Sequence, residues 1–226
     1  APFIVFEDAD IDAAVQGALV SKYRNSGQTC VCTNRILVQD SIHDVFVEKL
    51  VAATAELKMG NGLEEGVQQG PLVNEKAVGD VDRLVRLSTE AGAQVALGGV
   101  RSDLGPCYYQ PTVLTGITAD MAVFRNEIFG PVAPVMSFVD EAEAIALAND
   151  TDFGLASYFY TRDIGRVWRV SEALDYGMVG VNEGIISNEM APCGGGKASG
   201  SGREGSKYGS DDYLEIKYIL MGGLDR

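Results

Sequence analysis

Short apolar runs of strand length alternate with amphipathic segments of helix length along this chain. This alternation limits the fold more than any other feature, because strands separated by helices form a parallel sheet that the helices cover. The predicted fold class is α/β, a three-layer α/β/α domain with a mostly parallel sheet. We expect strands over 1–6, 35–39, 94–97, 110–114, 132–139, 155–160 and 178–181.

Apolar residues at three- and four-residue spacing predict five helices between these strands. The first follows the acidic stretch 8–12 and ends at 25–27, and Asp40 or Ser41 caps the second. The third runs to about Gly92, the last two cover 141–149 and 164–174, and the glycine-rich stretches 59–71 and 191–209 are loops. The side chains expected to face inward from the three longest helices are Ile11, Val15, Leu19, Tyr23, Val45, Phe46, Leu50, Val51, Leu57, Val78, Val81, Leu84, Val85 and Leu87.

The composition excludes several classes of partner. The chain has 226 residues, 46% of them hydrophobic and 22% charged, as in an ordinary globular protein. Its formal charge of -14 has the wrong sign for binding a nucleic acid or an anionic membrane surface, so neither is expected as a partner. Four cysteines are too few for a disulfide framework, and no apolar segment has the length or flanks of a membrane span or a signal peptide. We therefore expect a cytoplasmic protein.

Cys30 lies in a polar, glycine-containing turn between a predicted helix and a predicted strand, where a thiol can be exposed among backbone N–H groups. A free thiol is largely protonated at neutral pH, so a nucleophilic cysteine needs a neighbouring cation or backbone dipoles. The single histidine, His43, starts a predicted helix, where a solvated or capping role fits it best. A papain-type cysteine–histidine pair on one chain is therefore excluded, and these residues alone leave Cys30 as either a catalytic or a buried structural thiol.

Four motifs occur in a fixed order over nearly the whole chain. They are Gly27-Gln28-Thr29-Cys30, Asn126-Glu127-Ile128-Phe129-Gly130-Pro131, Asn149-Asp150-Thr151-Asp152-Phe153-Gly154-Leu155-Ala156 and Pro192-Cys193-Gly194-Gly195-Gly196-Lys197-Ala198-Ser199-Gly200. In this order they resemble the signature motifs of the aldehyde dehydrogenase superfamily. The residues around Cys30, the stretches 184–189 and 202–209, and the tail from Tyr213 are similar to the succinate-semialdehyde dehydrogenase branch of that family.

This resemblance implies a catalytic domain of the aldehyde dehydrogenase type and a covalent mechanism. The Cys30 thiolate would attack the aldehyde, its backbone N–H would help to hold the oxyanion, hydride would pass to NAD or NADP, and water would hydrolyse the thioester. By the match of its motif, Glu127 would hydrogen-bond the nicotinamide-side ribose, and Phe129 would pack near the cofactor. Outside that motif context, Glu127 is better interpreted as a solvated loop carboxylate.

A substrate with a carboxylate tail requires a cation and hydroxyl donors at the far end of its tunnel, and a guanidinium group suits this best. The resemblance assigns this contact to Arg24, six residues before Cys30, and to Ser187. The alternatives are a helix-terminal arginine that interacts with the helix dipole and an ordinary loop serine. The predicted substrate is the small molecule succinate semialdehyde, and glutarate semialdehyde or another short aldehyde acid is the alternative.

Cys30 and Cys32 form a Cys-x-Cys pair that lacks the two further ligands zinc needs, so no metal site is expected. In some members of the resembling branch such a pair closes reversibly into an inactivating disulfide, which makes Cys32 a candidate redox switch. Cys193 stands where the family's loop motif usually has an aromatic residue. Its smaller side chain would widen the substrate tunnel or loosen the loop.

The family's spacing places the general-base glutamate just ahead of Ala1 and the nucleotide-binding domain, with most of the cofactor contacts, farther upstream. We therefore expect residues 1–210 to be the cysteine-bearing catalytic domain, which by itself would not turn over aldehyde. Residues 211–226 would be an arm whose strand joins a homo-oligomer, a dimer or a tetramer. Two other classes stay open: a non-catalytic oligomerisation module, and a cysteine-dependent acyl transferase or esterase.

Overall fold

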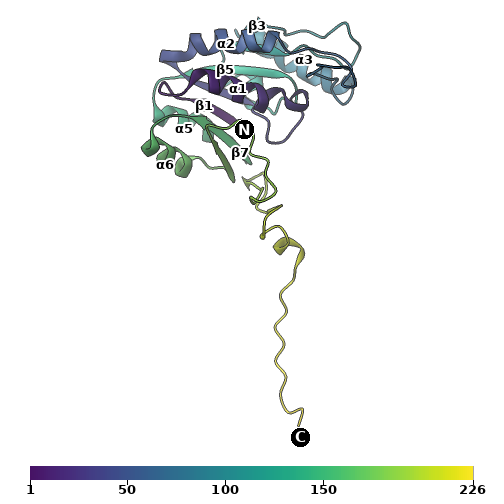
Figure 1. Cartoon of the computed structure of the whole chain (residues 1–226), viewed down its shortest axis with the longest axis vertical. Coiled ribbons are helices and arrows are strands. Elements are labelled where there is room, and N and C mark those ends of the chain that lie inside the picture. The colour runs from purple at the N-terminus through teal and green to yellow at the C-terminus, as the bar shows by residue number, and fades with distance from the viewer. Residues whose placement is uncertain (226) are drawn as a thin grey trace.

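The computed structural model describes residues 1–225 and contains a seven-stranded sheet with helices on both faces (Figure 1). The strand order is β3-β4-β5-β2-β1-β7-β8, in which β3 alone runs antiparallel to its neighbour and the other pairs are parallel. The predicted α/β class with a mostly parallel sheet is confirmed. The strands of this sheet are β1 (Pro2–Val5), β2 (Arg35–Gln39), β3 (Gln94–Leu97), β4 (Thr112–Thr115), β5 (Val132–Phe138), β7 (Ala156–Tyr160) and β8 (Met178–Val181).

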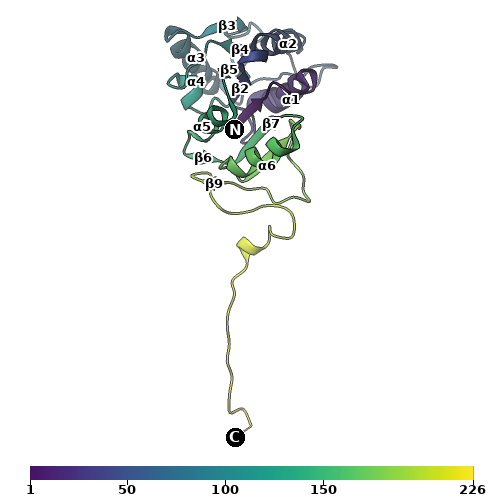
Figure 2. The ribbon, with the colours of Figure 1, turned by 90° about the vertical axis from the view of Figure 1, so that its left-hand side faces the viewer.

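The central strands are apolar on both faces, because successive side chains of a strand point to opposite sides. In the first strand and the residue after it, Phe3 and Val5 join one core cluster, and Ile4 and Phe6 join the other. Figure 2 shows the two helical layers that cover these clusters, with α1 and α2 on one side and α3 and α4 on the other. The helices are α1 (Ile11–Tyr23), α2 (His43–Ala55), α3 (Glu75–Glu90), α4 (Ala122–Arg125), α5 (Glu141–Asn149) and α6 (Ile164–Ala173).

Three details of the predicted helices are wrong. Neither Asp40 nor Ser41 caps α2, because a 3-10 helix over Asp40–Ile42 precedes it and the Ser41 hydroxyl donates to Glu7. Val45 is 47% exposed and Leu87 is 37% exposed, so both lie at the margin of their helix's apolar face. The four-residue helix α4 comes in addition to the five that the spacing predicts, and its short length leaves no periodic pattern to detect.

The glycine-rich stretch 191–209 is a loop, as predicted, apart from the two-residue strand β9 (Gly196–Lys197), which pairs with β6 (Phe153–Gly154). A 3-10 turn over Asp211–Tyr213 follows, and from Leu214 the chain extends away from the domain (Figures 1 and 2). The apolar side chains of this tail are 67% to 102% exposed between Leu214 and Met221. In the part of the chain that the structure describes, the tail forms no strand pairing, so its role in an oligomer stays a prediction.

Among residues 1–225, no helix combines the length and the apolar character needed to cross a bilayer.

Asp8 lies just after β1, and its side chain connects the loop that follows β1 with the loop that follows the neighbouring strand β7. Its carboxylate accepts hydrogen bonds from the Thr161 hydroxyl and the backbone N–H groups of Arg162 and Asp163, and it pairs with the Arg166 guanidinium at 2.6 Å. Partial burial alone would raise the pKa of Asp8, but these donors outweigh it and lower that pKa from its ordinary value of 3.8.

We expect Asp8→Asn to lower the free energy of unfolding by about 1 to 2 kcal/mol at pH 7, because several donors lose an ionised acceptor. A lowered folded-state pKa means that this stabilisation is complete above the unfolded value and is lost as pH falls through the folded one. The difference between variant and parent should therefore shrink below about pH 3.8. Urea unfolding at a series of pH values measures this difference in the free energy of unfolding. Asp103→Asn, at an exposed position, is the control. A difference that does not change with pH would contradict the assignment.

Candidate active site

A pocket of about 260 Å³ opens at the edge of the sheet where the parallel strands begin. Residues at the amino ends of three strands line it, namely Ala1, Arg35 and Ala156. The pocket also brings together four of the residues singled out from the sequence, which are Cys30, Cys32, Glu127 and Phe129. These residues lie almost one hundred positions apart in the chain, so the order of the strands is what brings them to one place.

The turn that carries Cys30 begins where α1 ends, with three consecutive residues in the left-handed region. Asn25, Ser26 and Gly27 have φ values of 51°, 55° and 78°. Side-chain bonds fix this turn: Asn25 donates to the Gln28 carbonyl at 3.0 Å, and Ser26 donates to the Gly70 carbonyl at 3.0 Å. Cys30 follows the fixed turn, and its side chain is exposed at the pocket.

Gly27 allows the cysteine turn to lie directly against the loop of Glu127 and Phe129. A Cβ atom at Gly27 would stand 2.1 Å from the Gly130 carbonyl oxygen, so no side chain fits there. Asn34 joins the same two segments, since its side chain accepts from the Ile128 N–H at 2.9 Å and donates to the Asn126 carbonyl at 2.9 Å. The segment of the nucleophile candidate and the loop of the cofactor-contact candidates are therefore in direct contact.

The environments of Cys30 and Cys32 differ sharply. Cys32 is 8% exposed, and its Sγ donates to the Lys22 carbonyl at 3.0 Å, whereas Cys30 is exposed. The backbone N–H of Cys30 has no acceptor among the described residues, so it is free to donate to an oxygen atom in the pocket. An exposed thiol beside a free N–H can form a covalent adduct with a carbonyl carbon and hold the resulting oxyanion.

Arg24 and Ser187 meet on the other side of the cysteine turn. The Arg24 Nη2 lies 3.5 Å from the Ser187 Oγ, at the long limit for a hydrogen bond. Together with Val31 they line a second, smaller pocket. Thr29 lines both pockets, whereas Cys30 lines only the pocket that contains Glu127.

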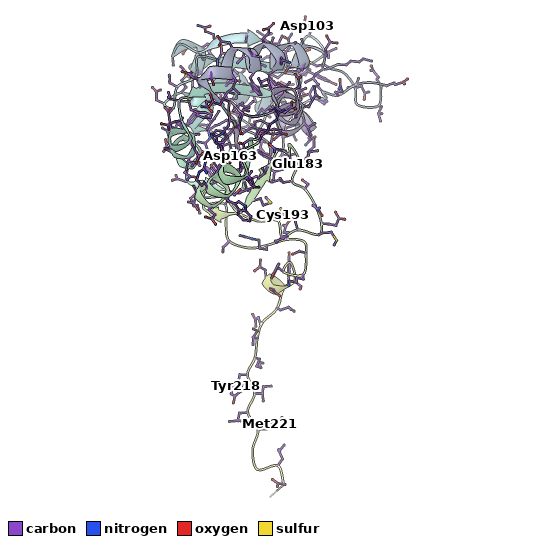
Figure 3. The ribbon with its side chains drawn as sticks, turned by 60° about the vertical axis from the view of Figure 1, so that its left-hand side comes forward. Asp103, Asp163, Glu183, Cys193, Tyr218 and Met221 are labelled. Atoms are coloured by element: carbon purple, nitrogen blue, oxygen red, sulfur yellow. The ribbon has the colours of Figure 1, made fainter. Side chains whose placement is uncertain are left out.

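Cys193 lines a third pocket, of about 550 Å³, which Ser187 also lines and Cys30 does not. Figure 3 labels it on the loop below the sheet, on the way to the tail that carries Tyr218 and Met221. Burial raises the pKa of the Cys193 thiol, and the charges of Glu204 and Cys30 act in the same direction. The raised pKa favours the protonated form of the Cys193 thiol.

Lys22 and Asn34 are among the pocket residues that were not identified from the sequence. Lys22 is 1% exposed and lines the Cys30 pocket, and Asn34 holds the two loops together. The signal for Lys22 was its position on the apolar side of the first helix, three residues after Leu19. No local pattern marks Asn34, because both of its partners are more than 90 residues away.

Among residues 1–225, no group of three or more histidine, cysteine or acidic side chains is arranged to hold a metal ion.

Comparison with known proteins identifies the family of this chain. Residues 1–219 match the family model described as "Aldehyde dehydrogenase family". A glutarate-semialdehyde dehydrogenase of Pseudomonas aeruginosa is 60% identical over 224 residues, which cover 99% of this chain and 46% of that protein. A mitochondrial succinate-semialdehyde dehydrogenase of Oryza sativa subsp. japonica is 59% identical over 225 residues, which cover 100% of this chain and 43% of that protein.

A solved structure extends the comparison to the fold. The crystal structure of succinate-semialdehyde dehydrogenase from Burkholderia pseudomallei superimposes with a TM-score of 0.96 at 59% identity, over 97% of this chain and 45% of that one. This chain thus spans about half the length of the curated relatives it matches. The resemblance carried by the four motifs is confirmed, and the chain belongs to the aldehyde dehydrogenase family.

Proposed function

We propose that this chain is the cysteine-bearing catalytic domain of a longer NAD(P)-dependent aldehyde dehydrogenase that oxidises a semialdehyde. The observation that carries the proposal is that Cys30 lines the pocket of the cofactor-contact candidates, while its neighbours Thr29 and Val31 line the pocket of the substrate-contact candidates. The first pocket contains Glu127 and Phe129, and the second contains Arg24 and Ser187. The turn that carries the thiol therefore borders both groups of candidates.

In this mechanism the Cys30 thiolate forms a carbon–sulfur bond with the aldehyde carbon, and the carbonyl oxygen becomes an oxyanion. The free N–H of Cys30 donates to that oxyanion. When bound, the cofactor accepts the hydride that leaves the same carbon, and the adduct becomes a thioester. Water then attacks the acyl carbon, the carbon–sulfur bond breaks, and the carboxylic acid and the Cys30 thiolate are released. We propose that the base for this water lies outside residues 1–226.

The pocket fits one end of a nicotinamide nucleotide. Glu127 is exposed there and offers carboxylate oxygens to ribose hydroxyls, and Phe129 is 43% exposed and offers an apolar ring. Most of the cofactor contacts would come from the nucleotide-binding domain that we propose ahead of residue 1. The relatives are about twice as long as this chain, which supports that arrangement. Both NAD and NADP are compatible with these residues.

Succinate semialdehyde is the substrate we propose, and glutarate semialdehyde is the alternative. The support is the Arg24–Ser187 pair, because a guanidinium and a hydroxyl together suit a carboxylate tail. The names of the relatives include both substrates. The number of carbon atoms in the preferred semialdehyde is therefore what an experiment has to determine. We also propose a cytoplasmic location, since all four cysteines are free in the described residues.

The full-length protein that carries this chain should oxidise succinate semialdehyde, with product formation followed at the nicotinamide absorbance. Cys30→Ser should abolish this activity, and Arg24→Met should lower kcat/KM by about 30- to 150-fold, equivalent to a lost charged hydrogen bond of about 2 to 3 kcal/mol. The rate on an uncharged aldehyde of similar length should change little in Arg24→Met.

The matched control is Arg86→Met, which removes an exposed guanidinium from α3. Equal wild-type rates on charged and uncharged aldehydes would refute the carboxylate pocket. Ester hydrolysis without any nicotinamide absorbance change would favour the acyl transferase or esterase. A faster rate on the five-carbon than on the four-carbon semialdehyde would select glutarate semialdehyde.

We propose that residues 211–226 form an arm that joins a homo-oligomer, a dimer or a tetramer. The support is the row of exposed apolar side chains on an extended segment, including Ile216 at 102% and Tyr218 at 82%. Deletion of 211–226 should therefore give a smaller particle in light scattering, and Ile216→Asp should weaken assembly. An unchanged mass after the deletion would contradict the arm. A full-length protein that assembles but oxidises no aldehyde would instead be the non-catalytic module.

We propose that Cys32 acts with Cys30 as a reversible redox switch. Both thiols line one pocket, and they are two residues apart. Oxidation of the two thiols by hydrogen peroxide would form one disulfide and release two molecules of water, after the Cys32 Sγ leaves the Lys22 carbonyl. Peroxide should inactivate the enzyme and a thiol should restore it. Oxidative loss that thiols reverse equally well in Cys32→Ala would refute the switch.

A further inference from the structure

The loop that follows β8 lies against α1 through a pair of glycines. Gly184 is buried there, although its neighbours Glu183 and Ile185 are exposed, and Figure 3 labels Glu183. A Cβ atom at Gly184 would stand 2.7 Å from the Gly17 Cα and closer still to the Gly17 carbonyl oxygen. The two backbones therefore touch, and no side chain fits between them. Gly184 has no positive φ, so this contact alone requires glycine there.

On the helix side of this contact, Gly17 also touches a buried ring of the sheet. A Cβ atom at Gly17 would stand 2.7 Å from the Tyr160 Cζ, and Tyr160 is 3% exposed at the end of β7. Protein interiors are close-packed and transmit strain, so the helix has no free space into which it could retreat. A methyl group added at Gly184 would therefore displace the loop, whose flanking residues are exposed, rather than the helix.

Two other contacts attach the same loop to the sheet. The Asn182 side chain accepts from the Thr161 N–H at 3.0 Å and donates to the Thr161 carbonyl at 2.9 Å. A Cβ atom at Gly180 of β8 would stand 2.8 Å from the Ile186 Cγ2, so the Ile186 side chain packs directly on that strand. These contacts lie on either side of Gly184, and Gly184 is what brings the loop onto the helix.

The pair of glycines determines how the substrate-contact pocket is built. Arg24 lies seven residues after Gly17, which corresponds to a helical rise of roughly 10 Å. Ser187 lies three residues after Gly184, and three extended residues span roughly the same length. The loop therefore runs beside α1 and brings the Ser187 Oγ to 3.5 Å from the Arg24 Nη2. Between these two segments the pocket is lined by Val20 and Ser21 of the helix and by Ile185 and Ile186 of the loop.

Little else fixes Ser187. Among residues 1–225, its hydroxyl has no hydrogen bond besides the long one with Arg24, and its backbone makes none outside helices and strands. The residue is exposed, so packing does not hold it either. The position of this hydroxyl relative to the guanidinium therefore follows from where the loop lies on α1.

We propose that Gly184 is a positioning residue for substrate specificity: because it has no side chain, the loop lies on Gly17 and holds the Ser187 hydroxyl where it can donate to the carboxylate that Arg24 binds. The inference rests on the proposed function in taking Arg24 and Ser187 as the contacts of the carboxylate tail. Cys30 does not line this pocket, so moving the loop changes the binding of the tail and leaves the nucleophile in place.

The test combines steady-state kinetics on succinate semialdehyde with calorimetric binding of succinate, both in the full-length protein. Gly184→Ala should raise KM and the Kd for succinate by about three- to tenfold, as expected for the loss of one neutral hydrogen bond. The value of kcat should change by less than about twofold, because only binding of the tail is weakened. Gly62→Ala is the matched control, since a Cβ atom at Gly62 meets no atom within 4 Å, and it should change neither constant.

A double-mutant cycle with Ser187→Ala separates positioning from a general packing defect. Ser187→Ala should itself raise KM, and adding Gly184→Ala should raise it by less than about twofold more, because both changes remove the same contact. A full additional effect of Gly184→Ala in the Ser187→Ala protein would overturn the proposal. If Gly184→Ala does not fold, Ile186→Ala replaces it in the cycle with the same expectation, since it loosens the same loop without adding an atom.

Binding of succinate requires no turnover, so the two proposals can fail separately. If the wild-type protein oxidises the semialdehyde but Gly184→Ala keeps the wild-type KM and Kd, this inference alone is wrong. If the wild-type protein oxidises no aldehyde but binds succinate with an affinity that depends on Gly184, the dehydrogenase function is wrong and the positioning role stands. A protein that neither oxidises the semialdehyde nor binds succinate would refute both.

Discussion

The candidate site depends on one close approach of two backbones, Gly27 against Gly130. A single added carbon at Gly27 would come within 2.1 Å of the Gly130 oxygen. This contact places the cysteine turn against the loop of Glu127 and Phe129. The Asn34 side chain adds two hydrogen bonds to the same loop. Two separate constraints require glycine at position 27. One is this close contact, and the other is its φ of 78°, which side chains disfavour.

Much of the fold could be predicted from the sequence, because strands apolar on both faces leave few arrangements other than a sheet between two helical layers. The boundaries of β2 and α5 agree with the predicted ranges to the residue. The errors lie where a long-range contact decides the outcome. Ser41 has the side chain of a helix cap, but Glu7, 34 residues earlier, takes its hydroxyl. Periodicity likewise finds the buried face of α3 but does not show that Leu87 lies at its margin.

The residues of the site could be named from motifs, but their arrangement could not. Arg24 and Ser187 are 163 residues apart, and only the placement of β7 and β8 beside β1 brings them within 3.5 Å. The same holds for the placement of Cys30 and Glu127 in one pocket, which no spacing along the chain predicts. Lys22 had a detectable signal as a charge on an apolar face, but its partner, the Thr33 carbonyl, is a backbone atom that no sequence pattern identifies.

The strand order also has a consequence for synthesis on the ribosome. β1 pairs on one side with β2, which follows soon after it, but on the other side with β7, where Phe3 faces Tyr158. At about 5 to 20 residues per second, the ribosome needs on the order of 10 to 30 seconds between these two residues. During that interval one edge of β1 has no neighbour, and the Val31 carbonyl beside the nucleophile lacks the Tyr158 hydroxyl that later binds it. The nascent chain therefore carries an open sheet edge and an incompletely anchored thiol until its second half emerges.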